Sequence, residues 1–261
     1  MENLNLSTSS PITWCPGCPN AQILVAFRQM VTELVHDGTL KFENIVALSG
    51  IGCHGKITDY LNMNTFTSLH GRLIPTMTGV KIANPALTVV GFSGDADSYN
   101  EGMEHLVHAA RKNSDINLFI HDNQVFALTT GQASPTSPKG FKGKSTPAGS
   151  TEEPFDPIPF MLTVGATFVA RTYAGDIQRT KHIMQAALAH RGFSFVDIIQ
   201  PCITFFDTRE YYKDRIVWLE DSFPRTDRAA AIAKASEHGD KVPLGIFYQV
   251  NRPTFEEELH A

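Results

Sequence analysis

The feature that most constrains the fold of this chain is a series of short apolar runs that end in polar, glycine-rich turns and are separated by helical stretches. The runs predict strands at residues 45–48, 88–92, 116–120, 167–170, 195–199 and 244–249. Apolar residues spaced three and four apart predict helices over residues 19–37, 100–112, 177–190 and 229–236. Strands that alternate with helices are typical of an α/β fold, in which a mostly parallel sheet carries helices on both faces.

Polar turns follow the carboxyl ends of three of these predicted strands. They comprise residues 50–53, 94–97 and 121–123. Open α/β sheets bind their ligands at this edge. We therefore expect the functional site there.

Composition excludes several classes of protein. The 261 residues allow one large α/β domain or two small ones, and we expect a single domain over residues 1–261. The formal net charge of −5 and the lack of a long basic run argue against nucleic-acid binding. The longest apolar stretches have only strand length, so we predict neither a membrane span nor a secretory signal, and we expect a cytoplasmic protein.

Asp95 and Asn123 each follow a different predicted strand. Carboxylate and amide oxygens suit a hard divalent cation such as Mg²⁺, which commonly bridges protein oxygens to a phosphate. Gly94 and the helix predicted after Asp97 would leave backbone N–H groups free for a diphosphate. The same residue types also suit a turn and a helix N-cap, so the pattern alone leaves a purely structural role open.

The chain has four cysteines: Cys15 and Cys18 form a CxxC pair, and Cys53 and Cys202 lie far downstream. Disulfides are not expected in a reducing compartment, which favours metal or redox chemistry. Their spacing suits a Cys₄ zinc site and a Cys₄ iron–sulfur cluster about equally. A thioredoxin-like CxxC fits less well, because Cys15 does not follow a predicted strand.

Residues 94–97, Gly-Asp-Ala-Asp, followed by Asn123, resemble the motif of thiamine diphosphate enzymes, a GDG sequence with an Asn pair further along the chain. The sequence departs from that motif at Ala96, which stands for Gly, and at Gln124, which stands for the second Asn. An alanine is tolerated there only if its φ angle is negative.

A longer set of motifs, in a specific order, resembles the thiamine-binding beta subunit of 2-oxoacid:ferredoxin oxidoreductases. The resemblance spans about residues 14–207 and extends toward residues 252–255. It rests on residues 14–20 (WCPGCPN), 50–56 (GIGCHGK), 69–72, 79–85, 131–137 and 200–202.

The resemblance implies three groups of site residues. The first group, Asp95, Asn123 and the Val125 carbonyl, would hold Mg²⁺ and the diphosphate. The second group would bind a 4Fe4S cluster and consists of Cys15, Cys18, Cys53 and Cys202. Residues 11–20 would form the cluster-binding N-terminal segment. The residues implied around the cofactor are Gly50, Ile51, Cys53, His54, Gly94, Asp95, Ala96, Asp97, Asn123, Val125 and Thr129. Substrate or partner contacts are implied for Lys56, His70 and Arg72, although each residue alone also suits a surface or packing role.

Residues 129–159, rich in Pro, Gly, Ser, Thr and Lys, are predicted to form a long active-site loop, because ordinary connections are only about 4 to 6 residues long. Its basic residues Lys139, Lys142 and Lys144 could attract an acidic ferredoxin or a coenzyme A phosphate. Solvated lysines are the simpler interpretation.

The resemblance further implies oxidative decarboxylation of a 2-oxoacid to an acyl-CoA and CO₂, with ferredoxin as electron acceptor. Thiamine enzymes need an activating glutamate, and Glu33, Glu101 and Glu104 all suit helix surfaces. In the family that glutamate comes from an alpha subunit, so we expect a hetero-oligomer with an alpha subunit, and in some assemblies gamma and delta subunits.

Several alternatives stay open from the sequence. The substrate can be pyruvate, 2-oxoglutarate, or a branched-chain or aryl 2-oxoacid. A non-oxidative thiamine decarboxylase subunit would need no cluster. A zinc-stabilised, magnesium-dependent phosphatase or nucleotide-sugar transferase would use Asp95 and Asp97 as a DxD motif, and a Cys₄ zinc scaffold would bind no cofactor.

Overall fold

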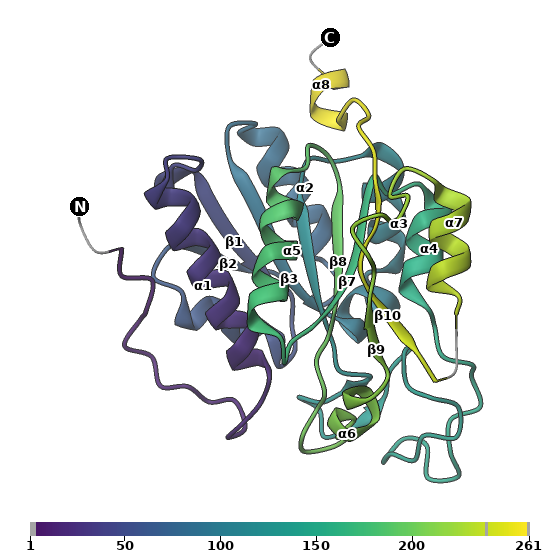
Figure 1. Ribbon diagram of the computed structural model, residues 1–261. Coiled ribbons are helices and arrows are strands. Elements are labelled where there is room, and N and C mark those ends of the chain that lie inside the picture. Colours follow the sequence, from purple (N-terminus) through teal and green to yellow (C-terminus); the bar gives the residue numbers. More distant parts are fainter. Residues whose placement is uncertain (1–3, 238–239, 260–261) are drawn as a thin grey trace.

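A computed structural model describes residues 4–237 and 240–259, and within these residues an eight-stranded sheet forms the centre of the molecule (Figure 1). In spatial order its strands are β2 (Asn64–Thr67), β1 (Ile45–Ser49), β3 (Thr88–Gly94), β4 (Asn117–Asp122), β8 (Ser194–Ile199), β7 (Phe168–Tyr173), β10 (Val242–Gln249) and β9 (Ile216–Trp218). From β2 to β7 all neighbours are parallel, whereas β10 runs antiparallel to β7 and pairs with β9 in parallel. The predicted mostly parallel α/β fold is confirmed.

Helices cover both faces of the sheet. Helices α1 (Asn20–His36) and α5 (Ile177–Ala189) pack on one face. The other face carries α2 (Leu73–Ala83), α3 (Met103–Lys112), α4 (Pro157–Val164) and α7 (Arg228–Ala235). Burying apolar side chains between these layers is the main force that holds them together.

The alternation of side chains along β3 shows how one strand serves both layers. Val90 and Phe92 belong to the core under α1 and α5, while Val89 belongs to the core under α2, α3 and α4. All three side chains are fully buried. A central strand of a parallel sheet therefore has to be apolar on both sides, which is why the sequence reads as a continuous apolar run.

The carboxyl ends of the parallel strands meet several short elements. These are the 3₁₀ turn η2 (His54–Tyr60), the π turn η3 (Asp97–Glu101), the small ribbon of β5 (Val125–Phe126) and β6 (Gln132–Ala133), and α6 (Arg209–Lys213). In Figure 1, α6 and the loop before α4 lie at the lower end of the sheet, opposite α8 (Phe255–Leu259). A 3₁₀ turn, η1 (Phe42–Asn44), precedes β1.

Two local expectations need correction. The predicted loop does not extend to residue 159, because α4 begins at Pro157, where a proline fits the first helical turn and Asp156 caps the helix by accepting the Ile158 N–H at 3.3 Å. The helix expected from residue 100 instead starts as the π turn η3 and continues as α3. Helix α2 was not predicted.

None of the described helices is both long enough and apolar enough to span a bilayer.

Candidate cofactor site and cysteine cluster

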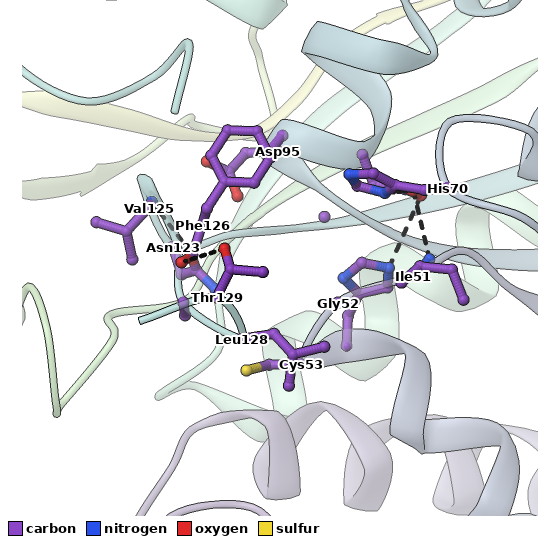
Figure 2. Close-up of a pocket in the computed structure, with 15 residues that line it drawn as sticks. Ile51, Gly52, Cys53, His70, Asp95, Asn123, Val125, Phe126, Leu128 and Thr129 are labelled. Carbon is purple, nitrogen blue, oxygen red and sulfur yellow. Dashed lines mark hydrogen bonds and ion pairs between the residues drawn. The ribbon is translucent and has the colours of Figure 1, made fainter. Parts of the chain in front are cut away.

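A pocket opens at the carboxyl ends of β1, β3 and β4, where the polar turns were expected (Figure 2). Asp95, Asn123 and Val125 lie on one side of it, and Ile51, Gly52 and His70 lie on the other. Its lining residues are Ile51, Gly52, Cys53, His54, His70, Gly94, Asp95, Ala96, Asp97, Asn123, Val125, Phe126, Ala127, Leu128 and Thr129. Residues far apart in the sequence are thus brought to one site by the parallel sheet.

Asp95 is a buried carboxylate, with a relative exposure of 2%, on the wall of this pocket. Its Oδ2 accepts a hydrogen bond from the Thr136 hydroxyl at 3.0 Å. Burial raises the pKa of Asp95 to about 6, against the lowering effect of its hydrogen bonds with Ser134 and Thr136. In the described part of the chain Asp95 makes no ion pair, so a cation is the group that would stabilise its charge.

Asn123 and Val125 form a tight turn on the same side of the pocket as Asp95. The Asn123 Oδ1 accepts the Val125 N–H at 3.1 Å, and the Val125 carbonyl accepts the Ala127 N–H at 2.8 Å. Amide and carbonyl oxygens have two lone pairs each, so both can accept a further partner. The turn therefore presents two oxygens that suit a hard cation.

Asp97 has different hydrogen-bond partners from Asp95, although only Ala96 separates the two residues. Its carboxylate accepts hydrogen bonds from His70 Nδ1 (2.7 Å), the Gly71 N–H (2.8 Å), the Ile51 N–H (3.3 Å) and the Ser93 hydroxyl (2.5 Å). Asp97 thereby joins the turn after β1 to the turn before α2. The two carboxylates are engaged by different partners, which does not favour a DxD pair that shares one cation.

Two histidines flank Asp97, and their pKa values are shifted in opposite directions. Burial lowers the pKa of His54 to about 4 despite the opposing charge of Asp97, so His54 is neutral at neutral pH. The hydrogen bond with Asp97 raises the pKa of half-buried His70, whose Nε2 also lies 3.2 Å from a carboxylate oxygen of Glu101. The carboxylates of Asp97 and Glu101 thus favour the protonated form of His70, which lies on the pocket wall.

Close backbone approach explains two of the glycines. A Cβ on Gly50 would lie 1.8 Å from Asp97 Oδ2, and a Cβ on Gly94 would lie 2.7 Å from His54 Nδ1. No rotamer change of a buried, hydrogen-bonded Asp97 would relieve the first clash, so residue 50 has to be glycine.

The four cysteines approach one another beside the pocket, and Cys53 also lines the pocket. The N-terminal segment before α1, which contains Cys15 and Cys18 and which we call the leader, is held there by Trp14. The indole N–H of Trp14 donates to the Cys53 carbonyl at 2.6 Å. The Thr204 hydroxyl donates to Cys15 Sγ at 3.2 Å, and the Gln200 amide lies 3.8 Å from Cys18 Sγ. Within the described residues, no three His, Cys, Asp or Glu side chains already stand as the ligands of a metal ion.

The protonation of the thiols reflects this crowding. Burial, together with the smaller effect of the neighbouring Cys18 and Cys202 thiols, raises the pKa of Cys53 to about 11. Burial is also the main cause of the raised pKa of Cys18. These raised pKa values favour the protonated thiols, and a metal that bound them would have to displace the protons.

Comparisons with known proteins agree with this geometry. Residues 50–198 match the family model for the thiamine pyrophosphate enzyme C-terminal TPP-binding domain, and residues 202–261 match the model for the C-terminal part of the pyruvate ferredoxin oxidoreductase beta chain. The subunit beta of 2-oxoacid:ferredoxin oxidoreductase 1 from Aeropyrum pernix is 41% identical over 94% of this chain and 80% of that protein. The chain belongs to the family of 2-oxoacid:ferredoxin oxidoreductase beta subunits.

Two further relatives support the assignment. The 2-oxoglutarate oxidoreductase subunit KorB of Mycobacterium tuberculosis is 39% identical over 98% of this chain and 80% of that protein. The solved 2-oxoglutarate:ferredoxin oxidoreductase from Magnetococcus marinus, with 2-oxoglutarate, coenzyme A and succinyl-CoA bound, superposes with a TM-score of 0.94 at 35% identity, covering 100% of this chain and 90% of that one. This beta subunit is thus part of an oxidoreductase that works with a partner subunit.

The beta subunit tolerates both departures from the thiamine diphosphate motif. Ala96 has a φ of −65°, which an alanine adopts without strain. Gln124 has a φ of +61°, in the left-handed region that Asn and Gly occupy more readily. The side-chain amide of Gln124 donates to the Thr136 carbonyl at 3.1 Å, which offers local compensation.

The structure does not bring Lys56 or Arg72 to the pocket wall. The Lys56 ammonium donates to the Thr13 carbonyl at 3.2 Å, and its charge opposes the rise in the pKa of Cys18 and Cys53. Arg72 is exposed and donates to the Glu101 carbonyl at 2.9 Å. Lys56 therefore lies with the cysteine cluster, and a substrate contact for either residue stays a prediction.

Other predicted residues have simpler surroundings. Thr129 lines the pocket, and its hydroxyl accepts from the Gln132 amide at 2.9 Å. Of the basic loop residues, Lys139 pairs with Glu153, and Lys144 donates to the Thr130 hydroxyl at 3.1 Å.

Sequence reasoning missed Phe126, Leu128 and Thr136. The ring centroids of Phe126 and His70 lie 6.3 Å apart. Leu128 lines the same pocket, and 48% of its surface is exposed. Thr136 lies within the matched motif 131–137, which carried the resemblance but no specific role.

Proposed function

We propose that this beta subunit binds thiamine diphosphate with Mg²⁺ and carries one 4Fe4S cluster. Together with its alpha subunit it oxidises a 2-oxoacid, transfers the acyl group to coenzyme A and releases CO₂. Ferredoxin accepts the electrons. The observation that carries the proposal is the position of Cys53. It lines the pocket of Asp95, Asn123 and Val125 and also neighbours the other three cysteines.

The residues present fit magnesium diphosphate. Asp95, Asn123 and the Val125 carbonyl would supply oxygen ligands, and the buried Asp95 carboxylate has no cationic partner among the described side chains. Thiamine diphosphate, when bound, supplies the electron sink for decarboxylation. Asp97 fixes the Ile51 turn on the pocket wall, and His70, whose pKa is raised by its bond with Asp97, would suit an anionic substrate or diphosphate group when protonated.

The residues present also fit an iron–sulfur cluster. Four soft thiol donors come together from the leader, the turn after β1 and the segment after β8. Such a set suits Cys₄ ligation of a 4Fe4S cluster. Hydrogen bonds from Thr204 and Gln200 to two of the sulfur atoms are of the kind that adjusts a cluster potential.

The pocket needs a partner to be complete. No glutamate is among its lining residues, and Glu101, which contacts the lining residue His70, does not itself line the pocket. We therefore assign the activating glutamate to the alpha subunit. The exposed apolar residues Ile51, Leu69 and Leu128 beside the pocket suit a protein surface that covers it.

The decisive experiment is anaerobic co-purification of this chain with its alpha subunit, followed by iron, acid-labile sulfide and zinc analysis and a visible spectrum. We expect about four irons and four sulfides per chain and an absorption that bleaches when 2-oxoacid, coenzyme A and thiamine diphosphate are added together. Ferredoxin reduction is then measured with a panel that includes pyruvate and 2-oxoglutarate.

Three results would contradict the proposal. Stoichiometric zinc without sulfide, after failed cluster reconstitution, would exclude the electron relay. Decarboxylation without ferredoxin reduction would favour the non-oxidative subunit. Full activity of the isolated chain would refute the need for a partner.

A further inference from the structure

A short part of the long loop contacts both segments of the proposed magnesium site. Residues 134–137, Ser-Pro-Thr-Ser, are buried or nearly so, and we call them the clamp. The clamp is itself fixed, because the Ser137 N–H donates to the Ser134 carbonyl at 3.0 Å and the Phe155 N–H donates to the Pro135 carbonyl at 2.7 Å. It is therefore a rigid part of the molecule within a loop that otherwise runs over the surface.

The first segment held by the clamp contains Asp95. The Thr136 hydroxyl lies 3.0 Å from Asp95 Oδ2 and 2.8 Å from Asp122 Oδ1. A hydroxyl has one hydrogen and can donate to one carboxylate at a time. Asp122 Oδ1 also accepts the Gln124 N–H at 3.2 Å, so Asp122 keeps a donor when the Thr136 hydroxyl donates to Asp95. The Thr136 hydroxyl is thus within hydrogen-bond distance of a proposed magnesium ligand and restricts the position of its carboxylate.

The second segment is the turn that contains Asn123 and Val125, with Gln124 between them. The Ser137 hydroxyl donates to the Gln124 carbonyl at 2.5 Å, and the Gln124 amide donates to the Thr136 carbonyl at 3.1 Å. These bonds hold Gln124 in its left-handed conformation, which costs free energy for a residue with a Cβ. The clamp thus fixes the turn that orients both ligand oxygens.

We propose that the clamp, through the Thr136 hydroxyl, is the positioning element that sets the geometry of Asp95 and of the Asn123–Val125 turn for magnesium diphosphate. This inference rests on the proposed function. Groups that orient metal ligands typically contribute about 10- to 100-fold to metal affinity. The part of the long loop nearest the site therefore acts as a fixed support for the ligands.

The test measures how thiamine diphosphate binding to the alpha–beta complex depends on Mg²⁺ concentration, by calorimetry. Thr136→Val keeps the shape and removes the hydroxyl, and we expect it to raise the Mg²⁺ concentration for half-saturation by about tenfold or more. Thr136→Ser restores the hydroxyl and should restore affinity close to wild type. Thr180→Val is the matched control, since Thr180 is also fully buried and donates to the Tyr173 carbonyl at 3.0 Å, away from the pocket.

Wild-type Mg²⁺ dependence in Thr136→Val, or an equal loss in Thr180→Val, would overturn the proposal, because either result means that the hydroxyl has no specific link to the metal. If Thr136→Val does not assemble, Ser137→Ala decides: the clamp predicts weaker Mg²⁺-dependent binding, and an unchanged value refutes it. A wild-type complex that binds no thiamine diphosphate at any Mg²⁺ concentration would instead refute the proposed function.

Discussion

The carboxylate side and the cysteine side of the site are built in opposite ways. On the carboxylate side, Asp95 and Asp97 are each 2% exposed and lie at the end of the central strand β3. On the cysteine side, Cys15 is exposed in a leader without regular structure, and Cys18 lies immediately before α1. One side is fixed by hydrogen bonds from rigid elements, whereas the other is assembled from separate segments.

The difference follows from the chemistry of the two ligand types. A buried carboxylate is costly unless donors or a cation compensate it, so the fold has to hold it in place even without the cofactor. A protonated thiol behaves as a small apolar group and needs no partner. The cysteine side therefore needs no bound group to be stable, whereas the carboxylate side depends on its hydrogen-bond donors.

The largest effect is expected from Cys18→Ser. Loss of one of four thiolates should remove the cluster and abolish ferredoxin reduction, while thiamine diphosphate binding persists because Asp95 and Asn123 are untouched. Iron and sulfide analysis, with calorimetry of cofactor binding, measures both properties. Thr204→Val, which removes only a hydroxyl next to Cys15 Sγ, should keep the cluster. Loss of cofactor binding in Cys18→Ser would show that the two sides are not independent.

The next effect is expected from Asp95→Asn, which keeps the shape but removes the charge. We expect the Mg²⁺-dependent affinity for thiamine diphosphate to fall by more than about 100-fold, since orienting residues alone contribute about 10- to 100-fold. The ligand-free variant should be no less stable than wild type, because it no longer buries an uncompensated charge.

Calorimetry and thermal unfolding measure these two quantities for Asp95→Asn. Asp176→Asn, at the exposed N-cap of α5, is the control. An unchanged affinity would refute the assignment of Asp95 as a ligand.

Asp97→Asn should produce a smaller, structural effect. An amide nitrogen would face donors that now point at Asp97, and His70 would lose one of its two carboxylate partners. We expect a loss of about 2 to 4 kcal/mol in the free energy of unfolding, measured by urea titration. Asp207→Asn, whose ion pair with Arg209 is exposed, should lose far less. Equal losses of unfolding free energy in both variants would mean that the hydrogen bonds of Asp97 do not stabilise the pocket wall more than an exposed ion pair stabilises the surface.

The sequence was sufficient to predict that the turns after β1, β3 and β4 meet at the carboxyl edge, because a parallel sheet brings its strand ends together. The resemblance singled out Asp95 as the metal ligand, but the sequence did not show what Asp97 contacts. The two differ in role only because the π turn η3 directs Asp97 toward His70 and Gly71, which come from another part of the chain.

Long-range loop contacts were equally hidden from the sequence. Helix α2 contains Pro75 and Gly79, which weaken a helical pattern, although Pro75 fits the first turn. Thr136 lies forty-one positions from Asp95, and nothing in its neighbours shows that the loop folds back to that carboxylate. Local patterns predict elements, whereas the path of a long loop depends on contacts made only in the folded chain.

The smallest expected effect is the pH dependence of His70→Gln. Because the hydrogen bond with Asp97 raises the folded-state pKa of His70 above the ordinary value of 6.5, protonated His70 stabilises the fold. That contribution is fully present below the unfolded pKa and is lost as pH rises through the folded pKa. The difference in Tm between wild type and His70→Gln should therefore be largest near about pH 6 and shrink toward about pH 9.

His182→Gln, on the exposed surface of α5, controls for the loss of an imidazole away from Asp97. Differential scanning calorimetry of the ligand-free complex, from about pH 6 to about pH 9, measures this difference in Tm. A difference for His70→Gln that stays constant or grows with pH would mean that Asp97 is held by backbone donors and Ser93 alone. The carboxylate side would then be fixed without a charged partner, and its contrast with the cysteine side would be sharper still.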